Sequence, residues 1–217
     1  MRNQARYTPA LVTAFMEKNS FTDVLFDLDG TLVDSAPGIM AGFSIALSLH
    51  GVVPACELSK AVIGPPLDET LRTISGISDA AMLEDLAASF RAYYDEKGYQ
   101  KTLLFEGVDD MLLSLLDRGY NLHITTNKRL KPTMLILDYF GWKKIFSSVC
   151  ALDSIQPRYK NKTEMLSNQL IQQGIAPKNA VYVGDSEGDR IAAQENSLYF
   201  IRADWGYEME NSRLDPA

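Results

Sequence analysis

Apolar residues along the chain follow two kinds of pattern, which predict its strands and helices. Short apolar runs, typical of buried strands, cover about residues 22–28, 121–126, 147–152, 180–184 and 198–202. Apolar residues that recur every three or four positions predict helices at 107–118, 131–139, 163–173 and 188–195. Because strands and helices alternate here, we predict an α/β fold with a doubly wound, parallel, Rossmann-like sheet.

Residues 36–104 follow a different pattern. Helical spacing in this stretch predicts helices at 38–50, 67–74 and 80–97. No convincing strand lies between residues 36 and 103. The chain therefore leaves the sheet after one strand and returns near residue 105. We predict a discontinuous core formed by residues 1–35 and 105–217, with an inserted all-helical cap domain over residues 36–104. Its Gly64-Pro65-Pro66 turn either aims backbone amides at a site or only separates two helices.

Residues 1–20 form a leader before the first strand. Residues 8–18 predict a short amphipathic helix, with Thr8 as the N-cap and Pro9 at the first helical position. This helix would pack on the core or on a second subunit.

The first apolar run ends in two carboxylates and a glycine. Alternation along a strand places Asp27 and Asp29 on the same side, so that both can face one point. Gly30 then lets the chain turn away sharply. A lone Asp-Gly turn needs no function. Two acids at the carboxyl end of a buried strand, however, lie where an open α/β sheet binds ligands.

The end of the run at 121–126 is also polar. Thr126 and Asn127 offer a hydroxyl and an amide that suit a phosphoryl oxygen, with Thr125 as the alternative if the register shifts. Alternatively, Thr125 and Thr126 are ordinary strand residues without a role in binding, and Asn127 caps the next helix.

A lysine near the start of helix 163–173 could neutralise phosphate and aspartate together. Asn161 is a good cap residue, which favours Lys162 as the first helical residue and as the site lysine. Lys160 in the preceding loop is the alternative, and most lysines are merely solvated.

The run at 180–184 again delivers acids at its end. Asp185 follows the strand directly, and Asp189 lies four residues later. A helix N-terminus that is enriched in acids could explain Asp189 but not Asp185.

Composition narrows the class of protein. The 217 residues are 46% hydrophobic and carry a net charge of −7, which argues against a nucleic-acid or anionic-membrane partner. Cys56 and Cys150 lack metal-binding spacing, and no segment approaches the apolar length of a membrane span. We therefore expect a cytoplasmic protein, either a monomer or a homodimer.

The segment Asp27-Leu28-Asp29-Gly30-Thr31 resembles the nucleophile motif of the haloacid-dehalogenase-like (HAD) superfamily. The Thr-Asn-Lys segment ending at Lys128, Lys162 and the Gly184-Asp185 segment are similar to its later motifs, in the same order. Asp204-Trp205-Gly206-Tyr207 resembles the tail of the phosphoglycolate-phosphatase-like branch. The resemblance covers about residues 22–207. One departure is Asn196-Ser197 in place of Ala-Gly, where we expect Asn196 to take a positive φ angle.

The resemblance implies a magnesium-dependent phosphatase that acts on a small phosphorylated metabolite. Asp27 would attack phosphorus and Asp29 would act as acid and base, assisted by Thr126 and Lys162. The implied Mg²⁺ ligands are Asp27, Asp29, Asp185 and Asp189. The implied phosphate-binding residues are Gly30, Thr126, Asn127 and Lys162. A phosphomutase, or a regulator that binds a phosphorylated ligand without catalysis, is the alternative.

Overall fold

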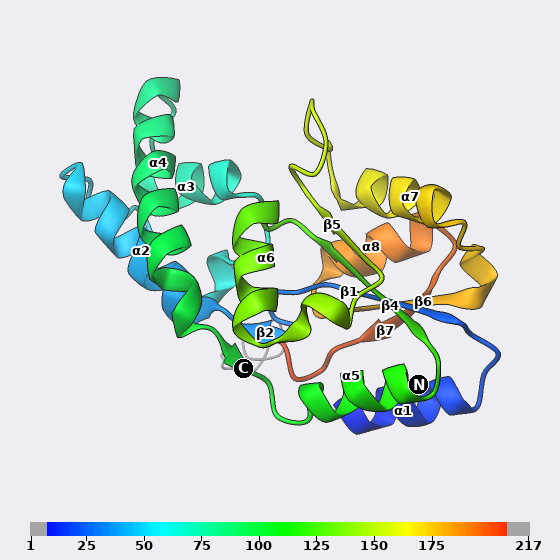
Figure 1. Cartoon of the computed structure of the whole chain (residues 1–217). Helices are drawn as coiled ribbons and strands as arrows, with labels where there is room; N and C mark the ends of the chain where they lie inside the picture. Colours follow the sequence, from blue (N-terminus) through cyan, green and yellow to red (C-terminus); the bar gives the residue numbers. More distant parts are fainter. Residues whose placement is uncertain (1–7, 208–217) are drawn as a thin grey trace, which may run out of the picture.

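The structure, a computed structural model, describes residues 8–207 of the chain. Its centre is a five-stranded sheet in the order β5-β4-β1-β6-β7 (Figure 1). The strands are β1 (Asp23–Phe26), β4 (Asn121–Thr126), β5 (Ser148–Ala151), β6 (Ala180–Gly184) and β7 (Tyr199–Arg202). All neighbouring strands in this sheet are parallel, which confirms the predicted α/β fold class.

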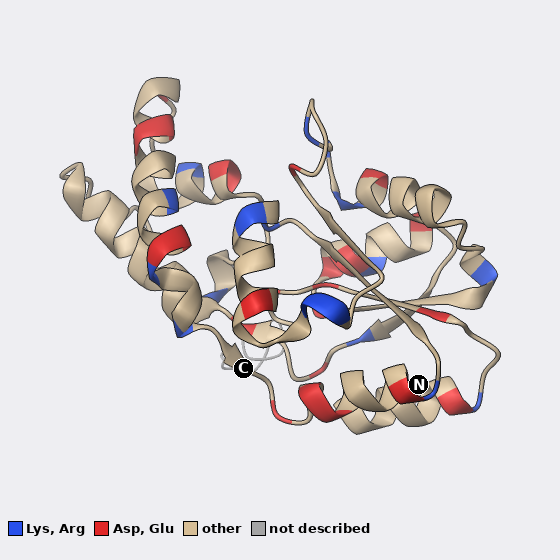
Figure 2. Cartoon of the chain, in the orientation of Figure 1, with Lys and Arg blue, Asp and Glu red and all other residues tan. Residues whose placement is uncertain are grey.

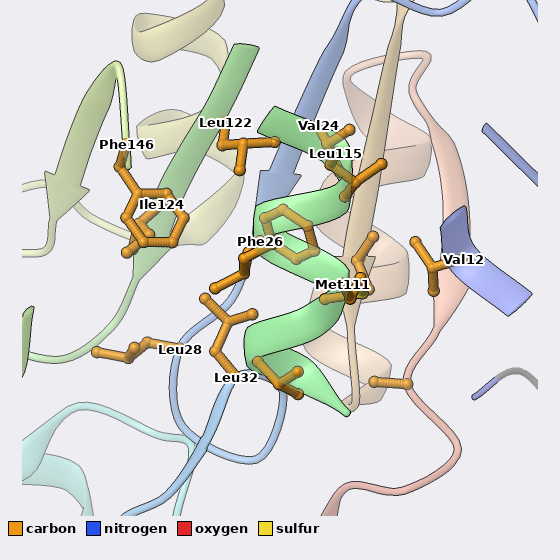
Figure 3. Packing of buried hydrophobic residues seen from close by; sticks show 14 of the residues in the cluster. Val12, Val24, Phe26, Leu28, Leu32, Met111, Leu115, Leu122, Ile124 and Phe146 are labelled. Carbon is orange, nitrogen blue, oxygen red and sulfur yellow. The ribbon is translucent and has the colours of Figure 1, made fainter. Parts of the chain in front are cut away.

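Helices cover both faces of the sheet. They are α1 (Pro9–Glu17), α5 (Val108–Asp117) and α6 (Leu130–Tyr139) on one face, with α7 (Lys162–Gln173) and α8 (Glu187–Glu195) on the other. Alternation along β1 produces the two layers, because Val24 and Phe26 pack toward α5 (Figure 3), whereas Leu25 packs toward α7 and α8. The strands can be apolar throughout because neither face of the sheet is left to water.

The segment between β1 and β4 forms a separate helical group. Its helices are α2 (Ala36–Leu49), α3 (Leu67–Ser75) and α4 (Ala80–Glu96). A short 3-10 turn at Lys60–Val62 lies between α2 and α3, and another at Gly98–Lys101 follows α4. These helices have their own apolar cluster, built around Phe43, Leu71, Leu86 and Phe90. Figure 1 shows the group beside one end of the sheet.

A two-stranded antiparallel ribbon, β2 (Val33–Asp34) with β3 (Leu103–Leu104), closes the base of this insert. The sequence analysis missed both strands because a two-residue strand is too short to produce an alternating pattern. The ribbon pairs the outgoing and returning chain, so it determines where the helical group joins the core.

The leader helix α1 packs on the core through Val12 and Met16, which are fully buried and belong to the same cluster as α5. Thr8 occupies the N-cap position but its side chain makes no capping bond. The first seven residues of the expected leader lie outside the described residues. Acidic and basic residues are intermixed along the helices (Figure 2). None of the helices within residues 8–207 is long and apolar enough to cross a membrane.

Candidate active site

Two neighbouring strands deliver carboxylates to the same edge of the sheet. Asp27 follows β1 and Asp185 follows β6, and the two strands are hydrogen-bonded partners. Asp189 comes from the first turn of α8. Carboxylate oxygens of these three acids lie within 4.8 Å of one another, and all three residues are buried. The structure thus brings together three of the four residues that the family resemblance implies as Mg²⁺ ligands.

Burial makes this cluster costly when it is fully ionised. Burial raises the pKa of Asp27, and the neighbouring acids Asp189 and Asp185 raise it further, although Lys162 opposes them. Burial also raises the pKa of Asp185 to about 7, with a further contribution from Asp189. Asp27 Oδ1 has no partner with hydrogen-bond geometry. These carboxylates therefore hold more negative charge than the surrounding protein compensates.

Asp185 is held in place by the turn after β1 and by the chain after β7. Thr31 Oγ1 donates to its Oδ1 at 3.2 Å, and the Tyr207 backbone N–H donates to its Oδ2 at 3.0 Å. Gly30 has a φ of 85°, and a Cβ atom there would lie 2.4 Å from Asp185 Oδ2. Glycine is therefore required at position 30 by both backbone conformation and space.

Lys162 lies in the middle of the acidic cluster. Its Nζ is 3.0 Å from Asp27 Oδ1 and 2.5 Å from Asp189 Oδ1, and its side chain is only 9% exposed. Burial lowers the pKa of Lys162, but attraction to Asp189 and Asp27 outweighs burial and raises it. The Asn161 side chain accepts a hydrogen bond from the Glu164 backbone N–H, so Lys162 is the first residue of α7. Lys160 is exposed, and the structure places Lys162 at the cluster.

Asp189 has a structural role as well. Its Oδ2 accepts hydrogen bonds from the backbone N–H of Ser186 at 3.0 Å and from the Ser186 hydroxyl at 2.6 Å. Its own backbone N–H donates to Ser186 Oγ at 3.1 Å, which completes a capping box at the start of α8. Its Oδ1 accepts from Lys162 and from the Tyr182 hydroxyl. Asp189 therefore caps α8 and is also a member of the acidic cluster.

Asp29 is held by a lysine, Lys128, that was not among the residues predicted for the site. Lys128 Nζ donates to both carboxylate oxygens of Asp29 at 2.9 Å, and the Ser35 hydroxyl also donates to Asp29. Burial lowers the pKa of Lys128, but Asp29 and Tyr94 together outweigh burial and raise it. The Lys128 ammonium lies 4.8 Å from the ring centre of Tyr94 in α4. The Thr-Asn-Lys segment was a signal for Lys128, but only folding shows that its side chain reaches Asp29.

The end of β4 separates the two candidate threonines. Thr126 lines the cavity beside Asp27 and Asp29, and its hydroxyl accepts from the Lys128 backbone N–H. Thr125 points to the other face, where its hydroxyl donates to Gln169 Oε1. Asn127 also lines the cavity, and its side-chain amide donates to the Gly64 carbonyl of the insert. The Gly64 turn thus meets the core through a carbonyl.

A cavity of about 430 Å³ opens between the core and the helical insert. Asp27 and Asp29 line it together with other residues of the core, and residues of α2, α3 and α4 line its insert side. Two ion pairs join its walls, with Arg129 bound to Asp95 of α4 and Arg158 bound to Asp68 of α3. The acids of the site are therefore enclosed by residues of the insert.

The turn after α8 corrects one expectation. Asn196 has a φ of −96°, and the positive φ, 57°, falls on Ser197. The Asn196 side chain instead donates to the carbonyls of Thr163 and Ala192, which ties α8 to α7.

Residues 24–203 match the family model for haloacid dehalogenase-like hydrolases, and the chain belongs to this family. It is 33% identical over 190 residues to a phosphoglycolate phosphatase of Xanthomonas campestris, a match that covers 86% of this chain and 84% of that protein. The family resemblance in the sequence is thereby confirmed.

Two further similarities concern a kinase and a solved structure. The chain is 34% identical over 185 residues to the tyrosine-protein kinase PtkA of Mycobacterium tuberculosis, a match that covers 85% of this chain but only 62% of PtkA. The crystal structure of a predicted phosphatase from Clostridium acetobutylicum superposes with a TM-score of 0.78 and 28% identity, over 89% of this chain and 91% of that one.

Proposed function

We propose that this protein is a magnesium-dependent phosphatase that hydrolyses a small phosphomonoester through an aspartyl-phosphate. The observation that carries the proposal is the convergence of Asp27, Asp185 and Asp189 within 4.8 Å, beside a buried lysine. The family match and the phosphoglycolate phosphatase relative support phosphate chemistry.

The residues present fit a hard divalent cation. Two carboxylates about 4 Å apart repel by roughly 4 kcal/mol at an effective dielectric constant of 20. The pKa values of Asp27 and Asp185 are raised first by burial and then by the neighbouring Asp189, which supports a site that a cation would stabilise. Carboxylate and carbonyl oxygens suit Mg²⁺, so Asp27, Asp185 and the backbone carbonyl of Asp29 would hold it, with Asp189 acting directly or through water. When bound, the ion would offset charge on both the carboxylates and the phosphate.

The chain's own residues then supply the chemistry. The Asp27 carboxylate attacks phosphorus, and the phosphorus–oxygen bond to the leaving alcohol breaks. Asp29 gives a proton to that alcohol and later takes one from the water that cleaves the aspartyl-phosphate. Thr126, Asn127 and Lys162, with the Gly30 turn, would stabilise the phosphoryl oxygens.

We further propose that residues 36–104 act as a cap domain that closes over residues of the 1–35 and 105–217 core. The Arg129–Asp95 pair and the bond from Asn127 to Gly64 support this proposal, since both join α4 or the Gly64 turn to the core beside the acids. Closure would keep bulk water from the acyl-phosphate.

Hydrolysis of p-nitrophenyl phosphate by the purified protein, with and without Mg²⁺, tests the proposal. We expect Mg²⁺-dependent turnover that falls by at least about 1,000-fold in Asp27→Asn, because the nucleophile is lost. Mass spectrometry of wild-type protein quenched in acid should show one added phosphoryl group, absent from the variant. If the wild type has no activity and the variant is indistinguishable from it, the protein is a binder of phosphorylated ligands instead.

The PtkA relative favours a second candidate, in which an acceptor other than water takes the phosphoryl group. A phosphomutase belongs to the same class. Comparing the amount of inorganic phosphate released with the amount of ester consumed distinguishes transfer from hydrolysis. Transfer to a protein or sugar hydroxyl would leave less free phosphate than ester consumed.

A further inference from the structure

The cavity beside Asp27 and Asp29 is larger than a phosphoryl group requires. Its volume is about 430 Å³. Pockets of about 300–1,000 Å³ typically bury most of a drug-sized ligand. Residues of α2, α3 and α4 line one side of this space, so the organic part of a substrate would contact them.

A row of aromatic rings forms one wall of this space. Phe43 stacks on Phe90 with ring centres 4.8 Å apart, and Phe90 stacks on Tyr94 at 5.4 Å with planes 8° apart. All three line the cavity. The row starts next to the acids, because the Lys128 ammonium that holds Asp29 lies over the Tyr94 ring. An apolar surface therefore leads from the acids into the insert.

The charged groups of the cavity are largely neutralised by one another. Four of the five cationic side chains that line it are ion-paired with carboxylates: Lys128 with Asp29, Arg129 with Asp95, Arg91 with Glu84 and Arg158 with Asp68. Arg72 is the fifth. At the other four, a second anion on the substrate would have to compete with a carboxylate, and it would lose hydration against apolar walls. A ring would lose no such hydration and would gain contact with Phe90 and Tyr94.

We propose that the substrate of this site is a phosphomonoester whose alcohol carries an apolar ring, bound against Phe43, Phe90 and Tyr94. The proposal rests on the proposed phosphatase activity and specifies its substrate class. It excludes a small acid with a second negative charge, such as phosphoglycolate, as the best substrate.

Alkyl phosphates whose alcohols are similarly basic test this choice with little change in the chemical step. We expect kcat/KM for 3-phenylpropyl phosphate to exceed that for ethyl phosphate by about 10- to 100-fold, since small apolar differences in a pocket change this ratio by about 10- to 200-fold. Phosphoglycolate should be no better than ethyl phosphate. Equal values for the two esters, or a preference for phosphoglycolate, would overturn the proposal.

A matched pair of variants locates the ring. Ala87 is 5% exposed and lines the cavity, whereas Ala88 is exposed on the same helix and does not line it. Ala87→Leu fills the ring subsite, so the preference for the phenylpropyl ester should fall by at least about 10-fold. Ala88→Leu should retain the preference. An unchanged preference in Ala87→Leu would place the ring elsewhere and contradict the assignment.

A binding measurement separates this proposal from the catalytic one. Calorimetry on the wild-type protein with Mg²⁺ compares 3-phenylpropylphosphonate with ethylphosphonate, neither of which can be hydrolysed. Tighter binding of the phenylpropyl compound without turnover of any ester would support the ring subsite and refute the phosphatase. Turnover of esters without that preference would refute the ring subsite and leave the phosphatase standing.

Discussion

Lys162→Met is the most informative single change, because it removes the ammonium but keeps an apolar side chain of similar length. The ammonium lies 3.0 Å from Asp27 Oδ1 and 2.5 Å from Asp189 Oδ1. Opposite charges 4 Å apart attract by about 4 kcal/mol at an effective dielectric constant of 20. Removing one partner of a buried ion pair typically costs about 3–5 kcal/mol, because the other charge stays buried.

We therefore expect Lys162→Met to lower the free energy of unfolding of the metal-free protein by about 3 kcal/mol at pH 8. The loss should be smaller at pH 5, because Asp27 and Asp185 have raised pKa values and are protonated there. Urea unfolding in the presence of EDTA measures both quantities. In the same variant, kcat/KM for p-nitrophenyl phosphate with saturating Mg²⁺ should fall by about 100- to 1,000-fold, as for other lost electrostatic donors.

Lys160→Met is the matched control. The Lys160 side chain is exposed, and its contact with Glu164 uses the backbone N–H, which the substitution leaves in place. The control should resemble wild type in both measurements. If Lys162→Met unfolds within about 1 kcal/mol of wild type, as for an exposed pair, the electrostatic reasoning is wrong. If Lys160→Met loses activity and Lys162→Met does not, the site lysine is Lys160.

Two further predictions follow from burial. Metal-free protein should lose stability as the pH rises from about 4 to about 7, because the folded state keeps a proton on Asp185 that the unfolded chain releases. Urea unfolding of Asp185→Asn should show a smaller loss over this range, and an equal loss would refute the assignment. With Ellman's reagent, the exposed Cys56 thiol should react at once and the buried Cys150 thiol only after unfolding; burial also raises the pKa of Cys150. Rapid reaction of both thiols would contradict this.

The sequence by itself determined the fold class, the strands that carry the site and the acids at their ends. The expected runs at 121–126 and 180–184 coincide with β4 and β6. These features are local: an apolar run predicts a buried strand, and alternation along it determines which side chains share a face. The helices at α2, α3 and α4 were predictable for the same reason.

Only the tertiary structure decided which polar groups meet. It placed Lys162 and not Lys160 at the acids, and Thr126 and not Thr125 at the cavity. It also joined Lys128 to Asp29, residues that are 99 positions apart in the chain. Such contacts depend on how strands stack side by side and on where the insert returns to the sheet. The pattern of apolar residues along the chain predicts neither the strand order nor the place where the insert returns, because both arise from packing between distant segments.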